Sequence, residues 1–216
     1  MSQNYIFGYG SLIQQESRMR AAPKARYALP VVVDGIARGW WARTGSIGFT
    51  TTYLGAVADD GAQCNGVLYA VSEEELERTH ERERGYTPTR IDPDKIHRLD
   101  GGSELPDATV WIYLNDFSPS NPLEKNLPTA ELPIVQSYVD ICVDGCLEIE
   151  AAFPTAGGFA RQFLETTREW STYWVNDRIY PRRPFIHVPN ASTIDGLLKA
   201  SLPEYFATIQ LEPVSY

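Results

Sequence analysis

Apolar residues in the first half of the chain occur in short β-branched and aromatic runs that are separated by glycine, aspartate and proline. These runs cover residues 4–7, 31–33, 49–57, 66–71 and 108–114. Runs of this length and composition predict strands, and the polar breaks between them favour a curved, mostly antiparallel sheet. We therefore expect strands to dominate the first half of the protein.

Helical spacing of apolar residues and paired start and stop signals predict helices at residues 72–84, 134–149 and 157–168. The first is the best marked, because Ser72 and Glu75 form a capping box at its start and Gly85 ends it. Proline and asparagine in residues 118–133 predict a surface loop. Residues 174–188 mix prolines with arginines and receive no assignment.

The predicted strand at residues 4–7 runs directly into Gly8-Tyr9-Gly10, which forces a tight turn. Ser11 and Gln14 then form a second capping-box pattern, so a helix is expected to begin at Ser11. Backbone amides of a glycine loop at a helix N-terminus attract anions, and a carboxylate or a developing oxyanion is their natural ligand. A plain strand-to-helix turn explains the same residues equally well.

Composition and charge favour a single domain over residues 1–216 with a small-molecule partner. The 216 residues are 43% hydrophobic and 22% charged, as in an ordinary packed domain. The net charge of −9 disfavours nucleic acid and anionic membrane surfaces, because both bind basic proteins. A signal-peptide pattern and a membrane-spanning run are both missing from the sequence, and three cysteines are too few for a disulfide framework. We expect a cytoplasmic protein with reduced thiols.

Glu83 is the candidate for acid/base chemistry. On the predicted helix from Ser72 it shares a stripe with Leu76 and His80, which should face the core. Desolvation and the negative end of the helix dipole both favour the protonated form of such a carboxylate, which can then act as a base and as an acid. The alternative is a structural ion pair with a neighbouring arginine, Arg82 or Arg84, on a solvated helix face. His80 is interpreted as a structural hydrogen-bonding residue.

Other chemistry-bearing residues have structural explanations. Cys142 and Cys146 share a helix face, but their spacing does not suit a metal site, so core packing is favoured. The arginines at 178, 182 and 183 suit bidentate binding of substrate carboxylates, although ion pairing within this acidic protein is the favoured interpretation. No nucleophile elbow or phosphate-binding loop occurs in the sequence.

Two segments together resemble the gamma-glutamylcyclotransferase superfamily, and its ChaC-like branch most closely. They are Phe7-Gly8-Tyr9-Gly10-Ser11-Leu12 and, about seventy residues later, Arg82-Glu83-Arg84-Gly85-Tyr86. The runs at 35–40 and 65–69 are similar to strands of the same family. The resemblance covers about residues 4–149 and implies an α+β fold with a small mixed β-barrel flanked by helices. Residues 150–216 are then a C-terminal extension that covers the site or forms an interface.

The resemblance also implies a reaction and a set of site residues. The α-amine of a γ-glutamyl group attacks its own side-chain carbonyl, which releases an amine and 5-oxoproline, as a carbon–nitrogen lyase does. The implied catalytic residue is Glu83, and the implied substrate-binding residues are Tyr9, Gly10, Ser11, Leu12 and Tyr138. The reaction requires no cofactor and no metal, because positioning, a base and oxyanion donors are enough.

Several alternatives stay open on the sequence alone. The substrate is glutathione or another γ-glutamyl compound. A related enzyme that removes a γ-glutamyl group from a specialised biosynthetic intermediate has the same motifs, and so has a non-catalytic protein that binds small molecules. The sequence leaves the oligomeric state undecided.

Overall fold

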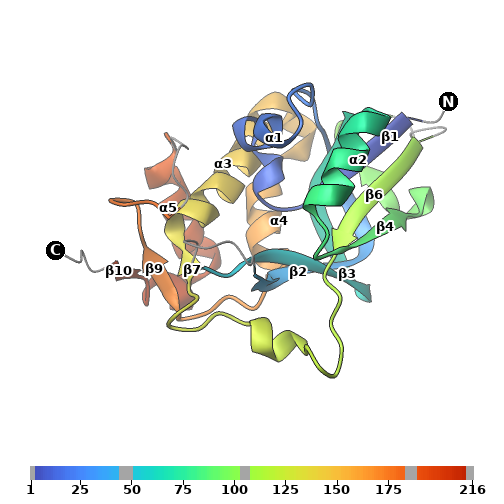
Figure 1. Cartoon of the computed structure of the whole chain (residues 1–216). Coiled ribbons are helices and arrows are strands. Elements are labelled where there is room, and N and C mark those ends of the chain that lie inside the picture. The colour runs from blue at the N-terminus through green and yellow to red at the C-terminus, as the bar shows by residue number, and fades with distance from the viewer. Residues whose placement is uncertain (1–2, 44–50, 103–107, 183–188, 213–216) are drawn as a thin grey trace.

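The computed structural model describes residues 3–43, 51–102, 108–182 and 189–212. Its main feature is a curled, seven-stranded sheet with the strand order β4-β6-β1-β3-β2-β5 and with β8 paired to β2 (Figure 1). The strands are β1 (Gln3–Gly8), β2 (Leu29–Ala42), β3 (Tyr53–Val71), β4 (Thr87–Ile91), β5 (Ile96–Arg98), β6 (Ala108–Leu114) and β8 (Thr167–Arg168). The pairs β1–β6 and β2–β8 are parallel, and the others are antiparallel. The predicted α+β fold is confirmed, with the sheet curled into a half-barrel.

The strands predicted at 49–57 and 66–71 are parts of one long strand, β3, so their separation was wrong; residues 49 and 50 lie outside the described residues. In the ladder between β2 and β3, Asp34 pairs with Gln63 and the next pair is Ile36 with Ala58. The register therefore shifts at this point, where the sequence predicted that one strand ends and another begins. Gly35 permits it, since its φ of 80° suits glycine. Hydrogen bonding to β2 resumes on both sides, which keeps β3 continuous.

The helices lie mainly in the second half of the chain, and short 3-10 turns link several elements. They are α1 (Gln15–Ala21), α2 (Glu73–Arg82), α3 (Gln136–Ala152), α4 (Phe159–Thr166), α5 (Ala191–Ser201) and α6 (Pro203–Phe206). The 3-10 turns are η1 (Ser11–Ile13), η2 (Pro93–Lys95), η3 (Leu123–Asn126) and η4 (Pro154–Ala156). The capping box of Ser72 and Glu75 forms as predicted at the start of α2.

The helix predicted at 134–149 starts two residues later than expected. Ile134–Val135 form β7, which pairs in parallel with β9 (Trp174–Asn176). A third strand, β10 (Gln210–Leu211), completes a small parallel sheet in the order β10-β9-β7. Both residues of β7 are fully buried, and two consecutive β-branched residues suit a strand better than a helix.

The main sheet is buried on both faces, and α3 lies at the centre of the molecule. Ile6 belongs to the core between sheet and helices, whereas the next residue, Phe7, belongs to a second core on the other face. Figure 1 shows α3 running between the main sheet and the C-terminal elements. A Cβ at Gly145 of α3 would lie 2.3 Å from the Gln14 backbone nitrogen, so only glycine allows α3 to approach this close to the segment after β1.

Candidate active site

The loop after β1 turns without the helix start that the sequence predicted. Ser11–Ile13 form a single 3-10 turn without a side-chain cap, and α1 begins only at Gln15. Gln14 has extended backbone angles and its side chain donates to Asp144 Oδ2 at 2.8 Å. The predicted capping box of Ser11 and Gln14 is therefore wrong, because the glutamine amide bonds to α3 instead of returning to the loop.

Glycine is required in this loop for close approach and not for positive φ. Gly10 has a φ of −135°, and a Cβ there would lie 3.1 Å from the hydroxyl of Tyr138. At Gly8, a Cβ would lie 3.0 Å from the Leu12 Cβ. The Leu12 side chain packs against the core, so its backbone is the part that faces away from it. The loop is thus pressed between β3 and α3.

Two buried arginines hold the carbonyl groups of the loop. Arg38 Nη1 donates to Tyr9 O at 3.2 Å, and Arg18 Nη1 donates to Leu12 O at 3.0 Å and to Ile13 O at 2.7 Å. Among the described residues, neither the Gly10 amide nor the Ser11 hydroxyl has a hydrogen-bond partner. The carbonyls are therefore engaged by the protein, while donors of the loop stay available to a ligand. Sequence reasoning missed both arginines; a lone charge inside the apolar runs of β2 was the signal for Arg38.

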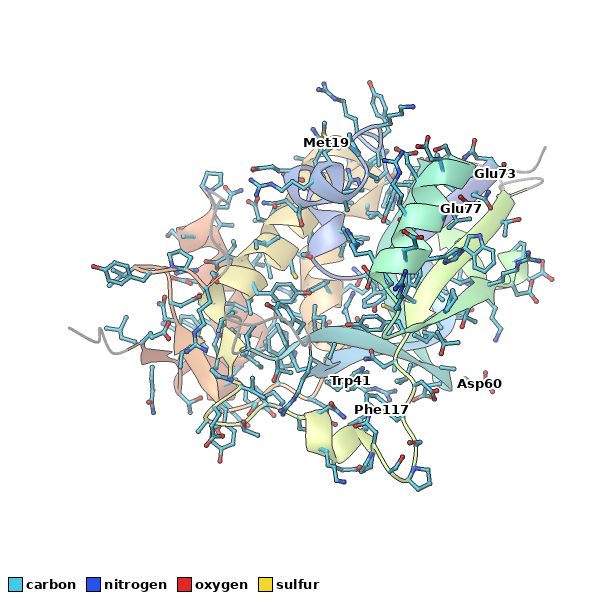
Figure 2. All side chains as sticks on the ribbon, in the orientation of Figure 1. Met19, Trp41, Asp60, Glu73, Glu77 and Phe117 are labelled. Atoms are coloured by element: carbon cyan, nitrogen blue, oxygen red, sulfur yellow. The ribbon has the colours of Figure 1, made fainter. Side chains whose placement is uncertain are left out.

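Glu83 lies just beyond the last residue of α2, at the C-cap position, with its side chain 22% exposed. Its Oε1 accepts from Arg82 Nε at 2.8 Å and lies 2.6 Å from Arg82 Nη2. No side chain or amide of the described residues bonds to Oε2. The ion pair that the sequence offered as an alternative is therefore present, and it leaves one carboxylate oxygen available. Glu73 and Glu77 of the same helix, labelled in Figure 2, are exposed, whereas Glu83 is partly buried.

The charge of this carboxylate acts on three tyrosine side chains. Burial raises the pKa of Tyr86 to about 12, with the negative charge of Glu83 as the next cause. The pKa of Tyr113 is raised to about 12 by the same two causes in the same order. Burial also raises the pKa of Tyr9, with contributions from Tyr86, Tyr138 and Glu83. The loop after β1 and the end of α2 therefore meet at one site.

Tyr138 completes this group from α3. Its ring packs edge-to-face on Tyr53, with centroids 4.9 Å apart, and its hydroxyl lies against Gly10. Of the predicted residues, Tyr9, Gly10, Tyr138 and Glu83 are brought together, and Ser11 and Leu12 follow on the same loop. Whether each of them binds substrate stays a prediction.

His80 and the cysteines have structural contacts. His80 Nδ1 lies 3.0 Å from the Tyr113 hydroxyl, and Tyr9 donates its hydroxyl to Tyr113 O at 3.0 Å, so a hydrogen-bonded chain runs from α2 through β6 to the loop. Cys142 and Cys146 are fully buried in the core and form no disulfide with described residues, in line with the predicted core packing. Within the described ranges no group of three histidine, cysteine or acidic side chains is arranged to hold a metal ion.

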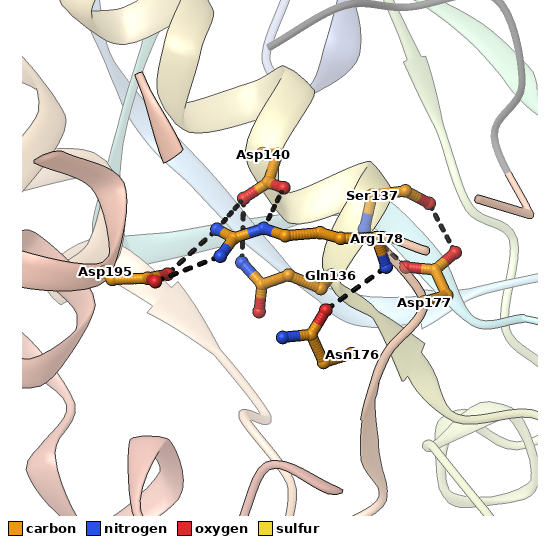
Figure 3. Close-up of polar contacts among 7 residues, drawn as sticks. All are labelled: Gln136, Ser137, Asp140, Asn176, Asp177, Arg178 and Asp195. Atoms are coloured by element: carbon orange, nitrogen blue, oxygen red, sulfur yellow. Dashed lines mark hydrogen bonds and ion pairs between the residues drawn. The ribbon is translucent and has the colours of Figure 1, made fainter. Parts of the chain in front are cut away.

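The C-terminal segment, meaning the described residues that follow α3, contacts α3, the helix that carries Tyr138 (Figure 3). Asp177 accepts from the backbone nitrogen of Ser137 at 2.7 Å and from its hydroxyl at 2.6 Å, so it caps α3 from a different part of the chain. Arg178 forms ion pairs with Asp140 at 2.7 Å and with Asp195 at 2.8 Å. Figure 3 shows its guanidinium lying between the two carboxylates.

Ion pairing, which the sequence favoured for these arginines, is confirmed where the structure describes them. Arg182 pairs with Glu212, and Arg183 lies outside the described residues. Indole rings continue the contact toward the site: Trp174 stacks on Trp170 at 5.1 Å, and Trp170 lies 5.2 Å from Trp40. Trp40 in turn packs edge-to-face on Tyr138 at 5.9 Å. The C-terminal segment therefore supports the site through α3 and through aromatic packing.

Comparisons with known proteins place this geometry in a family. The family described as "Gamma-glutamyl cyclotransferase, AIG2-like" matches residues 6–131, more than half of the chain. That range contains the loop after β1 and Glu83, and it ends before Tyr138. No protein with a curated description matches the sequence. None of the described helices is long and apolar enough to cross a membrane.

Solved structures share the fold at low sequence identity. A structure called "Gamma-glutamyl cyclotransferase" superposes with a TM-score of 0.55 at 14% identity and covers 74% of this chain and 86% of its own. The uncharacterized human protein loc79017 has a TM-score of 0.54 at 13% identity, with 79% and 92% covered. A yeast γ-glutamyl cyclotransferase specific to glutathione has a TM-score of 0.42 at 15% identity, with 76% and 97% covered. By its sequence match the chain belongs to the gamma-glutamyl cyclotransferase, AIG2-like family.

Proposed function

We propose that this protein is a γ-glutamylcyclotransferase that converts a γ-glutamyl compound into 5-oxoproline and a free amine, with Glu83 as the general acid and base. One observation carries the proposal: Oε2 of Glu83 has no hydrogen-bond partner among the described residues, and the charge of Glu83 contributes, after burial, to the raised pKa of Tyr9 on the glycine loop and of Tyr86 and Tyr113. A base with a free oxygen beside unpaired loop donors is the arrangement that the reaction requires.

The proposed reaction follows from these positions. Oε2 of Glu83 takes a proton from the substrate α-ammonium, and the freed amine attacks the side-chain carbonyl carbon of the same γ-glutamyl group. The new carbon–nitrogen bond gives a tetrahedral oxyanion, which the Gly10 amide and the Ser11 hydroxyl stabilise. Glu83 then returns the proton to the departing nitrogen as the old carbon–nitrogen bond breaks. The ring nitrogen, which still carries one extra proton after the attack, loses it to the regenerated Glu83 carboxylate, and that proton passes to the released amine, which leaves as an ammonium ion. The loop and Tyr138 fold the glutamyl chain so that amine and carbonyl meet.

The Arg82 contact has a part in this cycle. Because both contacts from Arg82 go to Oε1, they hold the carboxylate in one orientation and direct Oε2 to the other side. Structural pairing and catalysis are therefore compatible roles for the same residue.

Finer assignments stay predictions. The ChaC-like branch rests on the loop after β1 and the segment around Glu83 taken together, and glutathione is one of several γ-glutamyl compounds that the reaction accommodates. The two neighbouring functions are an enzyme for a specialised intermediate and a non-catalytic binding protein. The assignment as a carbon–nitrogen lyase in the cytoplasm follows from the proposed reaction and the sequence.

The test is release of 5-oxoproline by the purified protein from glutathione and from a panel of γ-glutamyl amino acids and amines. Glu83→Gln is measured in parallel, with Glu77→Gln as the matched control, since Glu77 is an exposed glutamate of the same helix. Release that requires Glu83 but not Glu77 is expected. No release from any member of the panel would refute the proposal in favour of one of the two neighbouring functions.

A further inference from the structure

Arg38 is a fully buried arginine of β2 whose guanidinium joins the loop after β1 to the C-terminal segment. Besides Tyr9 O, its acceptors are Asn65 O at 2.7 Å, Asn65 Oδ1 at 3.0 Å, Phe163 O at 2.8 Å, Thr166 Oγ1 at 3.0 Å and Thr167 Oγ1 at 2.7 Å. The Phe163 ring lies against the guanidinium, 3.9 Å from its central carbon. All five N–H groups therefore have an acceptor, and Arg38 can adopt only one orientation.

None of these acceptors is a carboxylate. Arg178 and Arg182 pair with acidic side chains, whereas Arg38 bonds only to neutral oxygens among the described residues. A buried charge without a counter-ion is costly. The C-terminal end of α4 supplies Phe163 O as an acceptor. This end offsets only part of the positive charge of Arg38, because a helix terminus carries about half a charge. A net positive charge is thus left beside the loop.

Other groups in the interior respond to this charge. Burial raises the pKa of the Cys64 and Cys146 thiols, and Arg38 acts against that rise at both. The negative charge of Glu83 is already paired with Arg82 and does not serve as a counter-ion for Arg38. The unneutralised guanidinium that contacts the loop therefore favours a negatively charged ligand group there.

We propose that Arg38 is a positioning residue that holds the Tyr9 carbonyl and whose charge makes the loop bind the α-carboxylate of the γ-glutamyl group. This inference rests on the proposed function for the identity of that group. The carboxylate would contact the loop donors and not Arg38 itself, since every guanidinium N–H is already engaged by the protein. Arg38 then acts on ground-state binding through the loop, so its loss raises KM more than it lowers kcat.

The test compares binding of 5-oxo-L-proline with binding of its uncharged carboxamide by calorimetry, with KM and kcat measured for any γ-glutamyl substrate that is turned over. Arg38→Met removes both the positive charge and the planar guanidinium with its N–H donors. Arg38→Lys removes the guanidinium and keeps the charge. Arg43→Met is the control, because among the described residues Arg43 likewise donates to neutral oxygens, the backbone carbonyls of Asn126 and Leu127, on another segment. Thermal melting identifies variants that fold.

The wild type is expected to bind the acid roughly tenfold or more tightly than the amide, a preference that one charge at this depth can supply. Arg38→Met should lose the preference, Arg38→Lys should keep most of it, and Arg43→Met should resemble the wild type. A wild type without preference, or a folded Arg38→Met that keeps it, would overturn the inference and leave the reaction intact. If Arg38→Met does not fold, loss of the preference in Arg38→Lys overturns it. An Arg38-dependent preference without turnover would refute the cyclotransferase reaction alone.

Discussion

Replacing Glu83 by glutamine should separate catalysis from stability. The substitution keeps the shape of the side chain and removes the proton acceptor at Oε2. The ion pair that is lost joins side chains that are 49% and 22% exposed, and pairs at this exposure contribute about 0–1 kcal/mol. A positioned general acid and base accelerates a reaction about 10²- to 10⁴-fold. That factor corresponds to about 3–5 kcal/mol of barrier, several times the expected change in folding free energy.

A spectroscopic readout checks the same geometry without substrate. The pKa values of Tyr86 and Tyr113 are raised to about 12, first by burial and then by the charge of Glu83. Removing a negative charge favours tyrosinate, so both pKa values should fall in Glu83→Gln while burial keeps them above the ordinary value of 10.0. An absorbance titration of tyrosinate measures the change.

The assay is 5-oxoproline release on the best substrate of the panel, combined with urea denaturation of wild type, Glu83→Gln and Glu77→Gln. Turnover near the wild-type rate in Glu83→Gln would refute the catalytic assignment. A loss of turnover that comes with an equal loss of folding free energy would refute the reasoning as well, because the defect would then be structural. Unchanged tyrosine titration would show that Glu83 is not next to these rings.

The remaining predictions address the loop, the C-terminal anchor and alkaline pH. Gly10→Val should abolish turnover and cost about 1–3 kcal/mol of folding free energy, because the branched valine side chain would meet the Tyr138 hydroxyl. Gly10→Ala should have a smaller effect on both turnover and folding free energy, and a fully active Gly10→Val variant would contradict this prediction. Asp177→Ala should lower folding free energy by about 2–3 kcal/mol in urea denaturation, since buried donors at the start of α3 lose their acceptor, and a neutral result would show that the cap is dispensable. The free energy of unfolding should fall as pH rises from about 10 toward 12, because Tyr86 and Tyr113 have raised pKa values in the folded protein and therefore ionise first in the unfolded chain. Constant unfolding midpoints over this pH range would contradict the raised pKa values.

Local sequence signals account for the parts of the fold in which neighbours along the chain decide the outcome. The capping box at Ser72 and the apolar strand at 108–114 were predictable, because hydrogen bonds and alternation of this kind need only a few consecutive residues. The same reasoning failed at Ser11, where the partner of Gln14 is Asp144, 130 residues away. It also split β3, because a ladder to another strand carries the chain through a polar break.

By itself the sequence determined the paired loop and glutamate motifs, the strand-rich first half and the family to which they point. Those properties depend on residue types at short spacing. Only the tertiary structure decided which groups meet at the site: the buried guanidinium of Arg38 under the loop, the approach of Tyr138 to Gly10, and the cap that Asp177 places on α3. These contacts join residues 29 to 128 positions apart, and they form because burying a charge or a helix end requires a partner wherever the fold supplies one.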